Sequence, residues 1–155
     1  MDNPTPPSDT GAVPAASPLA GLRAVIVEDE GITQLQLSRI LRSAGLTVIG
    51  SAADGKEAVD LVLATLPDIV LMDIRMPVMN GLEAAERILA EKNICILMLS
   101  AFSEEEYLER ARRIGASGYI IKPVTAESLL PQLEAVYRRH TSESGDGILT
   151  SLHGA

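Results

Sequence analysis

The chain repeats one pattern five times: a short, mostly apolar run is followed by a longer stretch with apolar residues at helical spacing. Short apolar runs bounded by turn residues are typical of strands, and apolar residues three and four positions apart indicate an amphipathic helix. Strands that alternate with helices form a parallel sheet with right-handed connections. The predicted strands are residues 22–27, 46–52, 68–73, 94–99 and 117–121, and the predicted helices are residues 32–45, 55–66, 82–92, 103–115 and 125–140.

Three of the predicted strands, "LRAVIV", "DIVLMD" and "ICILML", are almost continuously apolar. Such strands are expected where helices cover both faces of a sheet. The strand at residues 46–52, "LTVIGSA", is less apolar and is therefore expected nearer an edge. The predicted fold is an α/β domain with a doubly wound, five-stranded parallel sheet and helices on both of its faces.

The predicted folded domain covers residues 21–140. We interpret residues 1–20, which are rich in Pro, Ser, Ala and Gly, as a disordered arm, and residues 141–155 as a flexible tail. Pro131 stands inside the last predicted helix, where it is expected to kink the helix or to mark a later start.

Composition limits the partners and the compartment. The formal net charge of −8 disfavours direct binding to nucleic acid or to an anionic membrane, and no apolar run is long enough to cross a bilayer. The single cysteine, Cys95, excludes a disulfide within the chain and a metal cluster of several thiolates. A lone thiol among apolar residues fits a buried side chain in a reducing compartment, so a cytoplasmic location is expected.

Polar side chains follow the predicted strands at the points where those strands end. In parallel α/β sheets, ligands bind beyond the carboxyl ends of the strands. If the first, third, fourth and fifth strands are neighbours, these side chains converge on one pocket. Acids follow the first and third strands, a hydroxyl follows the fourth and a lysine follows the fifth: Glu28, Asp29, Glu30, Asp73, Ser100 and Lys122.

The chemistry of this set indicates phosphoryl transfer to a carboxylate. Clustered carboxylates repel each other unless a cation lies among them, and Mg²⁺ prefers carboxylate, water and phosphate oxygens. A lysine and a hydroxyl can bind a phosphoryl group, which leaves a carboxylate as the nucleophile. Taken singly, each residue has an ordinary alternative as a helix cap, a turn residue, a surface charge or a strand terminator; these residues are Asp29, Glu30, Asp73, Ser100, Lys122 and Pro123.

Four motifs, "VIVEDE", "DIVLMDIRMPVMNGLEA", "LMLSAF" and "GYIIKP", resemble the receiver domain of two-component response regulators over residues 22–139. The resemblance implies the flavodoxin-like strand order 2-1-3-4-5. It implies that Asp73 accepts a phosphoryl group from a sensor histidine kinase or a histidine phosphotransfer protein. It also implies direct Mg²⁺ ligation by Asp29, Asp73 and the backbone carbonyl of Arg75, with Glu28 acting through a metal-bound water.

The same resemblance implies roles for the other strand ends. Ser100 and Lys122 would bind phosphoryl oxygens, Tyr119 would turn inward as Ser100 moves, and Lys122-Pro123 would be a cis peptide. Glu28 and Ser100 stand where aspartate and threonine are also common in the family, and both keep the required chemistry. Arg75 stands at a variable position, and the resemblance gives its side chain no role.

Two other functions on this fold agree less well with these residues. A flavin-binding electron carrier needs a phosphate-binding loop after the first strand, where this chain has three acids, and aromatic residues make up only 3% of the chain. An aspartate-nucleophile phosphatase usually has a second acid two residues after the nucleophile, where this chain has Arg75. We therefore expect a phosphoacceptor signalling domain, with no enzymatic activity beyond self-phosphorylation from small donors and autodephosphorylation.

The output of such a domain is harder to predict. The segment "LSAFSEEEYLERARRIGASGYIIKP" also resembles the receivers of RNA-binding antiterminator regulators. Only about fifteen residues follow His140, too few for a helical output domain. Output is therefore expected through a phosphotransfer protein in a relay, or through a protein target or a self-dimer on the face formed by residues 103–115, 117–121 and 125–140. The alternative is a fragment of a longer regulator with an RNA- or DNA-binding output domain.

Overall fold

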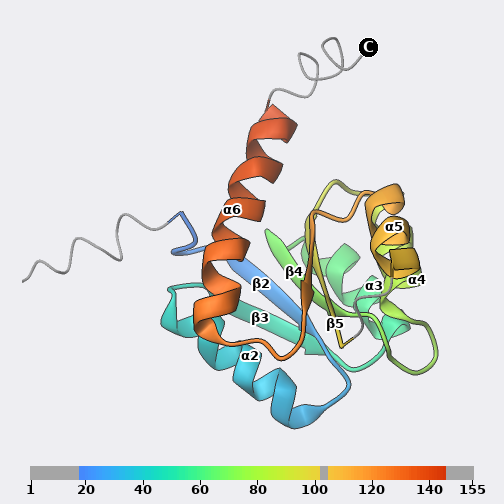
Figure 1. The fold of residues 1–155 in the computed structure, drawn as a ribbon, viewed down its shortest axis with the longest axis horizontal. Coiled ribbons are helices and arrows are strands. Elements are labelled where there is room, and N and C mark those ends of the chain that lie inside the picture. The colour runs from blue at the N-terminus through green and yellow to red at the C-terminus, as the bar shows by residue number, and fades with distance from the viewer. Residues whose placement is uncertain (1–17, 102–104, 146–155) are drawn as a thin grey trace, which may run out of the picture.

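The computed structural model describes residues 18–101 and 105–145. Their five strands form one parallel sheet in the order β3-β2-β4-β5-β6, which confirms the expected order 2-1-3-4-5 (Figure 1). The less apolar strand β3 lies at an edge, whereas every residue of the central strand β4 is buried. The strands are β2 (Arg23–Val27), β3 (Thr47–Ala52), β4 (Ile69–Asp73), β5 (Cys95–Ser100) and β6 (Gly118–Ile121).

Helices cover both faces of this sheet, as predicted (Figure 1). Successive residues of β4 face opposite sides: Val70 and Met72 pack with α3, α4 and α5, whereas Ile69 and Leu71 pack with α2 and α6. The sheet is therefore buried between two apolar layers, as its continuous apolar strands require. The helices are α2 (Gly31–Ser43), α3 (Gly55–Thr65), α4 (Gly81–Leu89), α5 (Glu105–Ile114) and α6 (Ala126–Gly145).

The fold extends beyond the predicted limits at both ends. Leu19, predicted to belong to a disordered arm, is 2% exposed and packs in the core on the side of α2 and α6. Helix α6 continues to Gly145 because no glycine or proline follows Pro131 before that residue, and Pro131 itself lies inside the helix, so a later start is wrong. Residues 1–17 and 146–155, and residues 103–104 of the predicted fourth helix, lie outside the described part of the chain.

Two further observations concern membranes and the cysteine. Within the described ranges, no helix is long and apolar enough to cross a membrane. Cys95, the first residue of β5, is a free thiol with no exposed surface, because it packs in the layer formed with α2 and α6.

Candidate functional site

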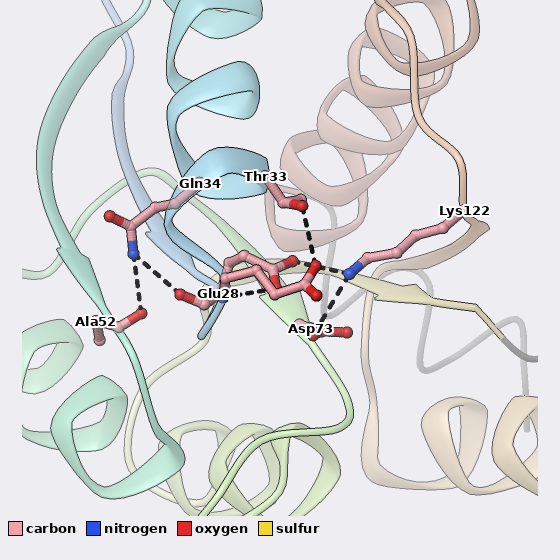
Figure 2. A network of polar contacts seen from close by, with 7 residues as sticks. Glu28, Thr33, Gln34, Ala52, Asp73 and Lys122 are labelled. Carbon is pink, nitrogen blue, oxygen red and sulfur yellow. Dashed lines mark hydrogen bonds and ion pairs between the residues drawn. The ribbon is translucent and has the colours of Figure 1, made fainter.

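Four strands bring polar side chains to one edge of the sheet. Because β2, β4, β5 and β6 are parallel neighbours, their carboxyl ends meet at that edge. Glu28 follows β2, Asp73 ends β4, Ser100 ends β5 and Lys122 follows β6. Figure 2 shows that Glu28, Asp73 and Lys122 point toward one another, so that groups 94 positions apart in the chain are in contact.

Lys122 interacts with both buried acids. Its Nζ donates a hydrogen bond to Glu28 Oε1 over 2.8 Å and lies 3.4 Å from Asp73 Oδ2. The side chain of Glu28 is 0% exposed, that of Asp73 is 8% exposed and that of Lys122 is 20% exposed. Because so little solvent screens these charges, the two ion pairs hold the ammonium group at the strand ends.

Hydrogen bonds with the backbone hold Glu28 in position. Its amide donates to the Ala52 carbonyl oxygen over 3.0 Å, and its Oε2 accepts from the amide of Glu30 over 3.2 Å. The side-chain amide of Gln34 on α2 donates to the carbonyl oxygens of Glu28 and Ala52, over 3.0 and 3.5 Å (Figure 2). The sequence did not single out Gln34, because a lone amide on a helix is no signal for such a contact.

The burial of the two acids raises the pKa of each carboxyl group. Burial raises the pKa of Glu28 although the hydrogen bond from Lys122 opposes it, and burial also raises the pKa of Asp73 against the charge of Lys122. Burial alone would lower the pKa of Lys122, but the hydrogen bond to Glu28 and the charges of both acids outweigh it, so this pKa is raised. The site therefore holds more negative charge than a buried position favours, which is the condition under which a cation binds.

Three carboxylates lie close enough together to hold a metal ion. One oxygen from each of Glu28, Asp29 and Asp73 lies within 4.8 Å of the others, and of the three residues only Asp29 is exposed. Hard divalent cations prefer oxygen ligands of this kind. The donor set therefore fits such a cation, although Lys122 and the amide of Glu30 already engage the two oxygens of Glu28.

The other residues selected from the sequence lie around these acids. Ser100 is 1% exposed at the end of β5, and the amide of Lys122 donates to its carbonyl oxygen over 2.7 Å. Tyr119 on β6 is half-buried and packs against the core layer shared with α3, α4 and α5. The Lys122-Pro123 peptide is cis, which confirms that prediction. Ser100 and Tyr119 stand on neighbouring strands, two register positions apart.

Arg75 lines a different cavity. It is exposed and borders a cavity of about 270 Å³ together with Tyr107 and Arg110 of α5. The remaining lining residues come from the β4–α4 loop and from α4. Arg75 thus stands two residues after Asp73 and also borders this neighbouring cavity.

The loop between β4 and α4 is anchored at both ends. The Gly81 amide donates to the Ile74 carbonyl oxygen over 2.7 Å, and a Cβ atom at residue 81 would overlap the carbonyl oxygen of Asp73. Asn80 caps α4, because its Oδ1 accepts a hydrogen bond from the Glu83 amide over 2.9 Å. Glycine is therefore required at residue 81, which has no room for a side chain.

Between these anchors, Val78 adopts a backbone conformation that is rare for a β-branched residue. Its φ is 69° and the residue is 79% exposed. The amide of Met79 donates to the Pro77 carbonyl oxygen over 2.7 Å, which closes a tight three-residue turn around Val78. The loop beside the acidic site therefore contains local backbone strain.

Comparisons with known proteins agree with this arrangement. The family model "Response regulator receiver domain" matches residues 24–134. "Transcriptional regulatory protein PdtaR" of Mycobacterium tuberculosis is 38% identical over 130 residues, which cover 84% of this chain and 63% of that protein. The chain thus spans less than two-thirds of the length of this relative. "Chemotaxis protein CheY" of Treponema pallidum is 35% identical over 137 residues, which cover 85% of this chain and 95% of that protein.

Solved structures show the same likeness. The CheX-CheY-BeF3-Mg+2 complex from Borrelia burgdorferi matches with a TM-score of 0.75 and 32% identity, covering 80% of this chain and 97% of the matched chain. The signal receiver domain of the putative response regulator NarL from Mycobacterium tuberculosis matches with a TM-score of 0.72 and 30% identity. The match covers 77% of this chain and 98% of the matched chain.

Proposed function

Because this chain belongs to the response regulator receiver domain family, we propose that Asp73 is its phosphoacceptor. The observation that carries the proposal is the position of Asp73, a buried carboxylate at the end of the central strand, 3.4 Å from Lys122 Nζ. The proposed donor is a phosphohistidine of a sensor histidine kinase or of a histidine phosphotransfer protein. Small phosphodonors also phosphorylate Asp73, and the phosphoryl group is lost again by autodephosphorylation.

The proposed cofactor is Mg²⁺. Asp29, Asp73 and the backbone carbonyl of Arg75 would hold it, with Glu28 acting through a bound water. When bound, Mg²⁺ supplies positive charge for the transferring phosphoryl group and reduces the repulsion among the acids. The acidic cluster supports this proposal, as does the solved complex of a 32% identical relative, which contains BeF3 and Mg.

In the transfer step, an oxygen of the Asp73 carboxylate attacks phosphorus. A P–O bond forms as the P–N bond to the donor histidine breaks, and the histidine nitrogen keeps the electron pair of the broken bond. Lys122 stabilises negative charge on the phosphoryl oxygens, and the Ser100 hydroxyl donates a hydrogen bond to one of them. The low exposure of Asp73, 8%, keeps bulk water from the carboxylate before transfer.

Ser100 and Tyr119 form the proposed switch. As Ser100 moves toward the new phosphoryl group, space opens beside β5 and Tyr119 turns inward. This change shifts the population between two conformations of the surface formed by α5, β6 and α6. That surface binds a protein target or a second copy of the chain. Two observations support the proposal: the two residues stand on neighbouring strands, and the apolar residue Ile121 of β6 is 41% exposed.

We propose that output proceeds through protein contact, because a chain with net charge −8 is poorly suited to bind nucleic acid or membranes directly. The free, buried thiol of Cys95 agrees with a reducing, cytoplasmic setting. A second candidate is a longer regulator with an RNA- or DNA-binding output region. It is favoured by the relatives named transcriptional regulatory proteins, of which the chain spans 63%.

Labelling with a radioactive acyl phosphate and Mg²⁺ tests the phosphoacceptor. The wild type is expected to take up label, and Asp73→Asn is expected to lose it. The matched control is Asp60→Asn, which removes an exposed carboxylate on α3, and it is expected to behave as the wild type. Equal labelling of Asp73→Asn and wild type would show that another residue accepts the phosphoryl group.

A pull-down from the source organism tests the output. Immobilised protein is compared with and without a phosphoryl-mimicking fluoride complex and Mg²⁺. A partner retained only in the activated state would support the switch, and an RNA- or DNA-binding partner would identify the process. Equal retention in both states would contradict a phosphorylation switch.

A further inference from the structure

Gln34, in the first turn of α2, contacts the loop that carries the first two acids of the site. Its side-chain Nε2 donates to the carbonyl oxygen of Glu28 over 3.0 Å and to that of Ala52 over 3.5 Å (Figure 2). Its backbone amide donates to the carbonyl oxygen of Glu30 over 2.9 Å. Gln34 therefore holds the carbonyl groups of both chain neighbours of Asp29, one through its side chain and the other through its backbone.

We propose that Gln34 is a positioning residue for the divalent cation, because its side chain fixes the Glu28-Asp29 peptide group and so keeps the Asp29 carboxylate beside the other acids. This inference rests on the proposed function, since it takes Asp29 as a ligand of the cation. Gln34 acts through that peptide group, to which its Nε2 is already bonded, and is assigned no contact with the cation or the phosphoryl group.

Asp29 depends on such support because it lies on the exposed side of the acidic cluster. Glu28 and Asp73 are buried and Asp29 is exposed, yet one oxygen of each lies within 4.8 Å of the others. Close packing restricts the side chain of a buried acid, whereas an exposed acid is positioned mainly by the backbone that carries it. A shift of the Glu28-Asp29 peptide group would therefore move the Asp29 carboxylate away from the cluster.

Glutamine suits this position because both of its partners are carbonyl oxygens. A carbonyl oxygen only accepts hydrogen bonds, and a side-chain amide has two N–H groups, one for each partner. The Ala52 carbonyl oxygen also accepts from the Glu28 amide over 3.0 Å, so Gln34 adds a further link just past the last paired residues of β2 and β3. An apolar or acidic side chain at residue 34 would lose both hydrogen bonds.

Binding of Mn²⁺, followed by the electron paramagnetic resonance signal of the free ion, tests this role. Gln34→Met keeps the length of the side chain but removes both donors, so it is expected to lower the Mn²⁺ affinity about tenfold. Gln34→Glu is also expected to lower the affinity, although its added negative charge alone would attract a cation. Gln36→Met is the control, because it replaces an exposed glutamine of the same helix, and it is expected to bind as the wild type. Wild-type affinity in Gln34→Met, or a higher affinity in Gln34→Glu, would overturn the inference.

Labelling with acyl phosphate at two Mg²⁺ concentrations distinguishes positioning from a general loss of structure. Gln34→Met is expected to be labelled slowly at limiting Mg²⁺ but within about twofold of the wild-type rate at saturating Mg²⁺, because a bound cation holds the loop in place of the side chain. Labelling that stays slow at saturating Mg²⁺ would contradict a positioning role.

Asp29→Asn separates this inference from the proposed function. It is expected to weaken Mn²⁺ binding more than Gln34→Met does, because it removes a ligand rather than the support of a ligand. Wild-type binding by Asp29→Asn would show that the proposed ligand is wrong. Weak binding by Asp29→Asn together with wild-type binding by Gln34→Met would overturn the inference alone. Failure of the phosphoacceptor would appear instead as labelling of Asp73→Asn.

Discussion

Gly81, the first residue of α4, lies directly against the carbonyl oxygen of Asp73, and no side chain fits between them. The Gly81 amide donates to the carbonyl oxygen of Ile74, the residue after Asp73, over 2.7 Å. The start of α4 and the end of β4 therefore form one packed unit. The orientation of the Asp73 carboxylate depends on this contact, because any displacement of α4 also moves the strand end.

Replacement of Gly81 by alanine is expected to lower the free energy of unfolding by about 2 kcal/mol, because the new methyl group meets backbone atoms that cannot turn away. Gly31 is the matched control, since it also begins a helix but has no atom within 4 Å of the position that a Cβ would occupy. Gly31→Ala is expected to be neutral or to stabilise slightly. Urea unfolding followed by circular dichroism measures both, and equal midpoints would contradict the packing argument.

Val78 is expected to reduce stability through its backbone conformation. Its φ of 69° suits asparagine better than valine, so Val78→Asn is expected to raise the free energy of unfolding by about 1 kcal/mol. Ile32→Asn is the control, because Ile32 is as exposed, at 77%, but stands in a helix. Thermal unfolding compares the two variants. A lower melting temperature for Val78→Asn than for Ile32→Asn would show that no strain is relieved.

The buried acids predict a particular pH dependence in buffer without divalent cations. The pKa values of Glu28 and Asp73 are raised above their ordinary values of 4.5 and 3.8. Between the ordinary pKa of each acid and its raised pKa in the folded protein, the folded state therefore binds more protons than the unfolded state. The stability that these groups contribute is complete below pH 3.8 and is lost as pH rises through their folded pKa values. The free energy of unfolding is therefore expected to fall from mildly acidic pH toward pH 7.

Asp73→Asn tests this pH dependence. Because Lys122 keeps its 2.8 Å contact with Glu28, removing the Asp73 charge leaves no unpaired lysine. The variant is expected to be about 1 kcal/mol more stable than the wild type at pH 7 and to show a flatter pH profile. Denaturant titrations between pH 4 and 8 measure both, with Asp60→Asn as the exposed control. A less stable Asp73→Asn at pH 7 would contradict the expectation.

Cys95 serves as a probe of unfolding because it is the single cysteine of the chain. Burial raises the pKa of its thiol to about 11. At pH 8 the thiol is expected to react with an aromatic disulfide roughly a thousandfold more slowly than in denaturant, because reaction requires opening of the core. Rapid labelling of the native protein would contradict its burial. The stability due to the neutral thiol should be lost as pH rises from 9.0 toward 11.

Local patterns in the sequence were sufficient to predict most of the fold. The apolar runs of β2, β4 and β5 and the apolar spacing of the helices are properties of a few consecutive residues, so the order and type of the elements could be predicted. The ends were less predictable. Leu19 was assigned to a disordered arm because its packing is with residues far away in the chain, and the polar end of α6 was assigned to a flexible tail.

The sequence predicted which residues form the candidate site, but it did not predict all the contacts among them. Asp73 and Lys122 were expected to converge because both stand at strand ends, and they lie 3.4 Å apart. That Glu28 acts toward a metal through water stays a prediction, and its hydrogen bond from Lys122 was not predicted. Gln34 carried no sequence signal, because its role depends on carbonyl oxygens of two different segments.

The sequence alone determined that this protein is a doubly wound parallel sheet with acids, a hydroxyl and a lysine at its carboxyl edge, because periodicity and strand-end chemistry are encoded locally. Only the tertiary structure decided that Lys122 lies nearer to Glu28 than to Asp73, since the two distances, 2.8 and 3.4 Å, join residues that are far apart in the chain. It also decided that residue 81 must be glycine, because the Asp73 carbonyl oxygen occupies the space that a side chain would need. Contacts between distant segments are set by packing of the whole domain, and no short stretch of sequence encodes them.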